Sequence, residues 1–348
     1  MDTSTWTDPK LAGQRLMAGF DGTRLNEGLQ RLIAGLRVGG LILFKRNVES
    51  PSQLSELTQS AQKLARDCGQ PPLFIAIDQE GGRVARLGPP FTQFPGTPPV
   101  TNAAEAARFA EITAAELAAA GINMDLAPVL DVAPAGFGSV MAERAFGSDP
   151  ERVARLGAIV IEGLQSRRIM AVAKHFPGIG RTTLDSHLDL PVLDADLPSF
   201  EAFDLIPFRA AIAKQVAGVM LSHIRYTGMD PLWPASLSQA IAKDLLRERM
   251  GYSGLVMTDD LDMGAIKNHY DVPTIIRRIL TADVDLALIC HKGPNIASAF
   301  DEIQRQLADD ADLKKHHEQS LSRIMHWKNK LFGRPPWLTN PPASLFPP

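Results

Sequence analysis

Short apolar runs rich in Val, Ile and Leu recur along the chain between longer stretches with apolar residues at helical spacing. This alternation is typical of βαβ units around a parallel sheet. The later runs are continuously apolar, as expected for strands buried on both faces. Eight runs are predicted as strands: Arg15 to Gly19, Gly40 to Phe44, Leu73 to Asp78, Gly121 to Leu126, Met170 to Lys174, Gly218 to Ser222, Gly254 to Asp259 and Asp285 to Cys290.

Helices are predicted between these strands. Ala103 to Ala120 is rich in alanine and glutamate, and Asp301 to Leu307 has apolar positions at helical spacing. Eight strands is the number in a (β/α)8 barrel, but a doubly wound sheet would satisfy the same pattern. A chain of 348 residues is compatible with one barrel domain.

Composition and charge narrow the class of partner. The hydrophobic fraction of 45% and the charged fraction of 22% are ordinary for a globular protein. A net charge of -3 gives no electrostatic reason to expect a nucleic acid or an anionic membrane as partner, so a small neutral ligand fits better.

The lack of a recognisable targeting signal and the small number of cysteines favour a soluble cytoplasmic protein. The segment Met1 to Trp6 lacks the basic and apolar regions of a signal peptide, and no uncharged apolar run reaches transmembrane length. Two isolated cysteines, Cys68 and Cys290, do not form the disulfide framework of a small secreted protein, which favours a reducing compartment.

Polar and charged residues cluster directly after the predicted strands. The clusters are Asp78 to Arg86, Lys174 to His187, Ser222 with His223, and Thr258 to Asp260. In a barrel, the active site is built from loops at the carboxyl ends of the strands. Four loops are therefore expected to present functional groups to one rim.

The loop Lys174 to His187 contains two glycines and a proline and is suited to fold over a ligand. Asp185 and His187 are two residues apart, so the carboxylate can accept the imidazole N–H and raise its basicity. Such a pair can act as a general acid and base. The same Asp-x-His spacing also suits simple capping of the loop.

Asp259 and Asp260 end the predicted strand that begins at Gly254. Neighbouring strand residues point in opposite directions, so only one of the two is expected to face the barrel mouth. Asp259 is the candidate nucleophile, because a carboxylate can attack an anomeric carbon and form a glycosyl-enzyme. The alternative is that one of the two caps the following helix.

Other chemistries are disfavoured by the motifs. The chain has no G-x-G-x-x-G fingerprint, no Walker A motif, no G-x-S-x-G elbow and no zinc-type spacing. No cofactor is expected. A metal site is not expected either, although these side chains could converge on one: His175, Asp185, His187, His223 and Asp259.

Taken together, several ordered blocks resemble glycoside hydrolase family 3, and within it the single-domain β-N-acetylhexosaminidases of bacterial peptidoglycan recycling. The blocks are Gly40 to Asn47, Asp78 to Arg86, Leu126 to Val132, Arg144 to Pro150, Lys174 to His187 and Thr258 to Met263.

This resemblance implies a single (β/α)8 TIM barrel over residues 1–348, with a Pro-rich tail from about residue 333. It implies retention of configuration, with Asp259 as nucleophile and with His187, oriented by Asp185, as acid and base. By the same position-wise matching, the residues that bind the sugar are Asp78, Arg86, Arg144, Lys174 and His175.

Two positions depart from the family pattern Lys-His-Phe-Pro-Gly-His-Gly and its continuation. Ile179 stands where a second histidine is expected, and Arg181 is a cation where a small or acidic residue is more frequent. An arginine near His187 would disfavour the protonated imidazole. The resemblance implies hydrolysis of terminal β-linked N-acetylglucosamine. The alternatives are a β-glucosidase or phosphorylase on the same scaffold, or a catalytically silent sugar-binding protein.

Overall fold

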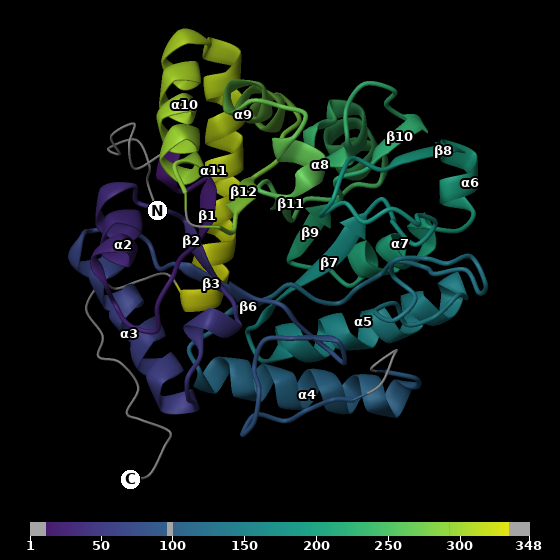
Figure 1. The fold of residues 1–348 in the computed structure, drawn as a ribbon, viewed down its shortest axis with the longest axis horizontal. Helices are drawn as coiled ribbons and strands as arrows, with labels where there is room; N and C mark the ends of the chain where they lie inside the picture. Colours follow the sequence, from purple (N-terminus) through teal and green to yellow (C-terminus); the bar gives the residue numbers. More distant parts are fainter. Residues whose placement is uncertain (1–11, 96–99, 292, 334–348) are drawn as a thin grey trace.

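Eight parallel strands close into a barrel in the computed structural model, which describes residues 12–95, 100–291 and 293–333. The strand order around the barrel is β1, β12, β11, β9, β7, β6, β3, β2 (Figure 1). Pairing of Leu16 with Ala287 joins the first strand to the last, which excludes an open doubly wound sheet. The strands are β1 (Leu16–Gly19), β2 (Gly40–Leu43), β3 (Phe74–Ile77), β6 (Met124–Asp125), β7 (Met170–Phe176), β9 (Gly218–Leu221), β11 (Leu255–Asp260) and β12 (Leu286–Ile289).

All eight predicted strands are therefore confirmed, but β6 is much shorter than the predicted range. The side chain of Asn123 takes over part of the ladder: its Oδ1 accepts the Ile75 N–H at 2.9 Å, and its Nδ2 donates to the Leu73 carbonyl at 3.1 Å. Beyond Asp125, Pro128 has no N–H to donate. Regular pairing of β6 is thus limited to two residues.

Helices surround the barrel (Figure 1). The predicted helices are confirmed in α4 and within α10. The helical segments are α2 (Glu27–Gln30), η1 (Arg31–Gly35), η2 (Lys45–Asn47), α3 (Pro51–Asp67), α4 (Ala103–Ala119), α5 (Pro150–Ser166), α6 (Leu197–Glu201), α7 (Leu205–Ala213), η3 (Ala235–Leu237), η4 (Ala240–Arg249), α8 (Gly264–Lys267), α9 (Val272–Thr281), α10 (Asn295–Asp309) and α11 (Ala311–Phe332).

Local sequence signals explain where several helices begin. Ser50, Asp149 and Asp271 each accept a backbone N–H of the first turn with their side chains, and a proline occupies the first turn of α3, α5 and α9. Side-chain caps satisfy N–H groups that have no partner within the helix, and proline is suited to the first position.

The amino-terminal end of the barrel is closed by α11. Side chains inside the barrel, including Met17, Phe74 and Met257, form one hydrophobic cluster with Leu321 and Ile324 of α11. Lys328 of the same helix donates to Gln14 Oε1 at 2.8 Å and to the Gly39 carbonyl at 2.9 Å. Functional loops are therefore left to the opposite, carboxyl-terminal end.

Two small sheets lie at that end of the barrel. The hairpin β4 (Gln79–Gly81) with β5 (Val84–Ala85) follows β3, and β8 (Val192–Asp196) pairs with β10 (Arg225–Gly228). The apolar pattern did not predict them, because they are short and β8 alternates between exposed and half-buried residues.

Two sequence features lie outside the described residues: the segment Met1 to Trp6 and the Pro-rich tail from Arg334 onward. Within the described part, no helix combines the length and apolar character needed to span a bilayer.

Candidate active site

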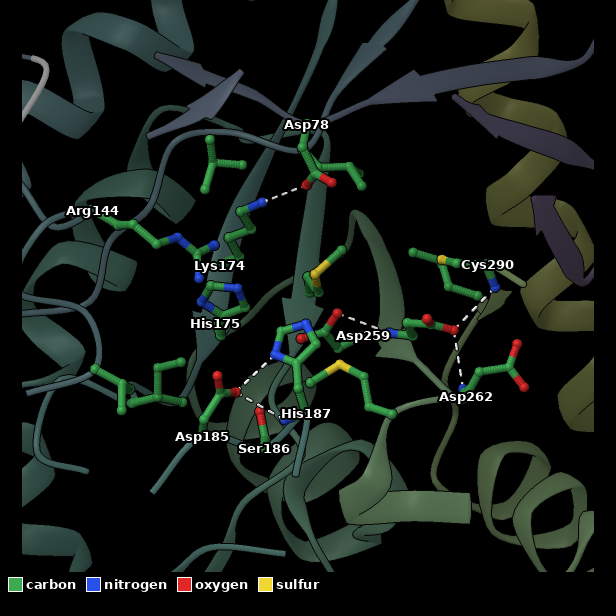
Figure 2. Close-up of a pocket in the computed structure, with 18 of the residues that line it drawn as sticks. Asp78, Arg144, Lys174, His175, Asp185, Ser186, His187, Asp259, Asp262 and Cys290 are labelled. Carbon is green, nitrogen blue, oxygen red and sulfur yellow. Dashed lines mark hydrogen bonds and ion pairs between the residues drawn. The ribbon is translucent and has the colours of Figure 1, made fainter. Parts of the chain in front are cut away.

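A cavity of about 500 Å³ opens at the carboxyl ends of the barrel strands. Figure 2 shows side chains from several loops converging on it. All eight residues predicted for the site line this one cavity: Asp78, Arg86, Arg144, Lys174, His175, Asp185, His187 and Asp259. Three of the four predicted clusters therefore meet at one rim, whereas Ser222 and His223 do not line the cavity.

Asp259 lies at the end of β11 and is partly exposed to the cavity. Its Oδ1 accepts the N–H of Asp260 at 2.8 Å. Burial alone would raise the pKa of the Asp259 carboxyl, but the neighbouring His175 ring and this hydrogen bond lower it. The carboxyl is thus held as an anion, which a nucleophile requires.

The side chain of Asp260 stabilises the local backbone. Its Oδ1 accepts the N–H of Asp262 and the N–H of Cys290, each at 3.0 Å, and so fixes the turn after β11. The next helix, α8, begins after Met263 and has no side-chain cap. Neither aspartate caps that helix, so the capping alternative is replaced by a turn contact made by Asp260 alone.

Asp185 and His187 form the expected pair. Asp185 Oδ1 accepts the N–H of His187 at 2.9 Å and lies 2.7 Å from its Nδ1 (Figure 2). Burial raises the pKa of Asp185, but both hydrogen bonds from His187 lower it to a net value below the usual range. The carboxylate both caps the turn and orients the ring. With Nδ1 engaged as a donor to Asp185, Nε2 is the nitrogen available for proton transfer.

Asp78 lies beside two cations of the cavity. Its Oδ1 is 2.8 Å from Lys174 Nζ and its Oδ2 is 2.9 Å from Arg86. Although burial opposes ionisation, these two cations hold the pKa of Asp78 far below its usual value. The three side chains form a fixed polar wall suited to sugar hydroxyl groups.

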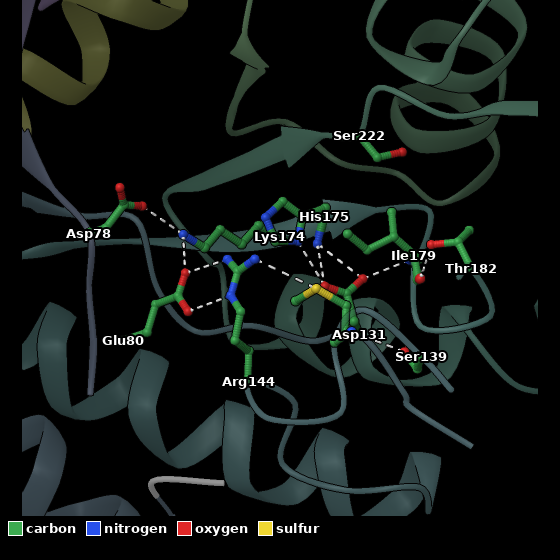
Figure 3. A network of polar contacts seen from close by, with 12 residues as sticks. Asp78, Glu80, Asp131, Ser139, Arg144, Lys174, His175, Ile179, Thr182 and Ser222 are labelled. Carbon is green, nitrogen blue, oxygen red and sulfur yellow. Dashed lines mark hydrogen bonds and ion pairs between the residues drawn. The ribbon is translucent and has the colours of Figure 1, made fainter. Parts of the chain in front are cut away.

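Glu80 is a member of the same network that sequence reasoning missed. It binds Arg144 through both oxygens, at 2.7 and 3.0 Å, and its Oε1 lies 2.6 Å from Lys174 Nζ (Figure 3). The Glu80 side chain is 4% exposed and does not line the cavity. It lies behind the predicted sugar-binding cations and fixes their positions.

Asp131 is the second missed residue. Its Oδ2 lies 2.8 Å from His175 Nδ1, and its Oδ1 accepts the Ile179 N–H at 2.8 Å (Figure 3). Asp131 is completely buried and His175 is 5% exposed. One carboxylate therefore fixes a cavity-lining imidazole and the root of the loop that carries His187.

The two departures from the family pattern are accommodated by packing and pairing. Ile179 is 7% exposed and belongs to the hydrophobic core. Arg181 binds Asp204 at 2.6 Å and stacks over the Phe200 ring at 4.6 Å. The charge of Arg181 is thus directed to Asp204, which argues against the expected effect on His187. Burial raises the pKa of Asp204 to about 6 despite this pairing.

His223 lies beneath the site. Its Nε2 is 2.9 Å from the Asp260 carbonyl and its Nδ1 is 2.7 Å from Ser236 Oγ. A carbonyl can only accept, so Nε2 carries the proton and Nδ1 accepts from the serine. Burial lowers the pKa of His223, which favours this neutral form. Both nitrogens are occupied, so the ring is not free for a metal. Within the described residues, no three His, Cys, Asp or Glu side chains are grouped to hold one.

The chain matches the family model described as the glycosyl hydrolase family 3 N terminal domain over residues 7–326. It is similar to a beta-hexosaminidase from Alkalilimnicola ehrlichii, with 38% identity over 84% of this chain and 84% of that protein.

Solved structures agree. A glycoside hydrolase family 3 beta-N-acetylglucosaminidase from Paenibacillus superposes with a TM-score of 0.91 and 33% identity over 99% of this chain, which spans 66% of that protein. A beta-N-acetylhexosaminidase from Beutenbergia cavernae gives a TM-score of 0.88 and 28% identity, covering 94% and 99% of the two chains. The chain therefore belongs to glycosyl hydrolase family 3.

Proposed function

We propose that the protein is a retaining β-N-acetylhexosaminidase that removes terminal β-linked N-acetylglucosamine from small glycosides of the muropeptide type. The observation that carries the proposal is the shared cavity of Asp259 and the Asp185–His187 pair. Names of relatives across most of the chain length support the acetamido sugar as substrate. The free thiols of Cys68 and Cys290 support a reducing compartment such as the cytoplasm as its place of action.

In the first step, a carboxylate oxygen of Asp259 attacks the anomeric carbon. The bond from that carbon to the leaving oxygen breaks, and the Nε2 proton of His187 passes to this oxygen. Asp185 stabilises the imidazolium before the transfer and keeps the proton on Nδ1 afterwards. The products are the free aglycone alcohol and a glycosyl ester on Asp259.

In the second step, the neutral Nε2 of His187 accepts a proton from water. The water oxygen attacks the anomeric carbon, and the ester bond to Asp259 breaks. Two inversions give net retention of configuration. The free carboxylate and the protonated imidazole are restored, so the cycle closes without a cofactor.

Side chains on the opposite wall of the cavity bind the sugar. Asp78, Arg86 and Lys174 are locked to one another by ion pairs and hold their donors and acceptors in place before substrate arrives. Such pre-organised charged groups bind hydroxyl and amide groups at a small cost in side-chain entropy.

The test is release of nitrophenol from nitrophenyl β-N-acetylglucosaminide by the parent and by Asp259→Asn, with the β-glucoside and added phosphate in parallel. The proposal predicts turnover of the acetamido substrate alone, a loss on the order of 1,000-fold or more in the variant, and no acceleration by phosphate. Preference for the glucoside, or acceleration by phosphate, would indicate the alternative enzymes. Sugar binding without turnover would indicate a silent binder.

A further inference from the structure

The predicted acid and base is poorly protected by burial. The side chains of His187 and Asp185 are 67% and 54% exposed. A proton donor must be held near the leaving oxygen, because a misplacement of about 1 Å can cost on the order of 100-fold in rate. Something other than burial must therefore hold this part of the loop.

Backbone contacts from α8 reach the loop at His187 itself. The N–H of Gly264 donates to the His187 carbonyl at 3.2 Å, and the N–H of Ala265 donates to the Ser186 carbonyl at 3.1 Å. These are N–H groups of the first helical turn, which have no partner within a helix. Here the loop that carries the predicted acid and base satisfies them.

Gly264 permits this close approach. A Cβ at this position would lie 2.7 Å from the His187 carbonyl oxygen and closer still to that of Leu188. Both obstacles are backbone atoms, so a larger residue would displace the loop. The glycine is required by space and not by a left-handed backbone.

A side-chain contact joins the same two segments further along. His269 Nε2 lies 2.5 Å from Asp189 Oδ1, and Asn268 Nδ2 donates to the Leu188 carbonyl at 3.5 Å. Each of these pairs joins residues 80 positions apart in the sequence. The loop is thus held over residues 186–189.

The helix that holds the loop is itself fixed to the nucleophile strand. Ala265 and Ile266 are completely buried, and α8 begins at Gly264, shortly after β11 ends at Asp260. Asp259 and His187 are therefore both positioned by β11 and the short helix that follows it, although 72 positions separate them in the sequence.

We propose that Gly264, Ala265, Asn268 and His269 form a clamp that positions His187 for proton transfer. Gly264 and His269 act as positioning residues of the reaction, and neither lines the cavity. This inference rests on the proposed function, because it assumes that His187 is the acid and base. In this proposal, α8 and the residues after it determine how accurately His187 is placed for proton transfer.

The experiment compares aryl β-N-acetylglucosaminides whose leaving groups range from dinitrophenol to phenol. Dinitrophenol leaves without a proton, whereas phenol needs the acid. Gly264→Ala is expected to lower kcat/KM for the phenyl substrate on the order of 100-fold and to change the dinitrophenyl value little. His269→Ala and Asp189→Ala are expected to lose roughly fivefold on the phenyl substrate, and the double variant no more than either.

Controls separate positioning from folding. His326→Ala removes an exposed histidine of α11 and should match the parent. Thermal unfolding of each variant checks the fold, and His269→Ala, an exposed substitution, tests the clamp even if Gly264→Ala does not fold. Equal losses for all leaving groups, or parent-like rates in both His269→Ala and Asp189→Ala, would overturn the clamp. An inactive parent would instead contradict the proposed function.

Discussion

Asp131 Oδ2 lies 2.8 Å from His175 Nδ1, so the site contains a second Asp–His pair, almost fully buried, beside the exposed pair of Asp185 and His187. The two pairs have the same chemistry in different surroundings. The buried ring is fixed and suits binding, whereas the exposed ring can reach an aglycone or water and suits proton transfer.

Asp131→Asn tests the buried pair. One amide oxygen cannot replace both carboxylate oxygens, which accept from His175 and Ile179. We expect a loss of about 1–3 kcal/mol in the free energy of unfolding and at least a tenfold lower kcat/KM, measured by urea unfolding and nitrophenol release. The matched control is Asp125→Asn. The amide oxygen of asparagine can still accept the Gln79 N–H that Asp125 Oδ1 accepts at 3.0 Å, so the variant should stay close to the parent.

Glu80→Gln tests whether Glu80 holds the side chains of Arg144 and Lys174 in place. The amide keeps the shape of Glu80 but removes the charge between Arg144 and Lys174. We expect KM for the nitrophenyl substrate to rise more than kcat falls, because the two cations lose their fixed positions. An unchanged KM would show that Asp78 alone is enough to hold Lys174.

The same variant carries a pH signature. Burial opposes ionisation, but Lys174 and Arg144 lower the pKa of Glu80 below its reference value of 4.5. A lowered pKa adds stability above pH 4.5, and this stability is lost as the pH falls through the folded value. The stability gap between parent and Glu80→Gln should therefore be largest near pH 7 and shrink below pH 4.5. A gap independent of pH would contradict the charge pairing.

Arg181→Ala tests where that unusual cation acts. The substitution leaves Asp204 buried without its partner, so we expect a loss of about 3–5 kcal/mol in the free energy of unfolding at pH 8. Burial already raises the pKa of Asp204 to about 6, and removing Arg181 raises it further. Protonation relieves the penalty, so the loss should be smaller at pH 5.

Two further measurements complete that test. Asp204→Asn in the Arg181→Ala background should recover most of the stability, because no buried charge remains. The pH–rate profile of Arg181→Ala should overlay that of the parent, since Arg181 is directed to Asp204 and not to His187. A shifted profile would restore a role for Arg181 in proton transfer.

Much of the barrel could be predicted from sequence, because strands buried on both faces leave continuous apolar runs. The run Met170 to Lys174 lies within β7, and Gly218 to Ser222 contains β9. The short β6 could not be predicted, since it depends on contacts of the Asn123 side chain with the backbone of Leu73 and Ile75, which lie 50 and 48 positions away in the sequence.

The candidate site could also be predicted only in part from the sequence. Asp78 directly follows β3, and Lys174 and Asp259 lie near the ends of β7 and β11, so their positions were readable from the strands, whereas Arg144, Asp185 and His187 lie further along loops and were identified by the motif matches. Glu80 and Asp131 were quoted within matched blocks but given no role, because their partners Arg144 and His175 lie 64 and 44 positions away. The contact of His269 with Asp189 depends on how a loop and a short helix meet, which neither spacing nor periodicity reports.

Mass spectrometry of the enzyme with a slow acetamido substrate shows whether Asp259 forms a covalent bond to the sugar. We expect one added sugar residue on the peptide that contains Asp259, which is absent in Asp259→Asn and is lost as product is released. An adduct on Asp260 or another residue, or turnover by the parent with no adduct under conditions that accumulate it, would rule out Asp259 as the nucleophile.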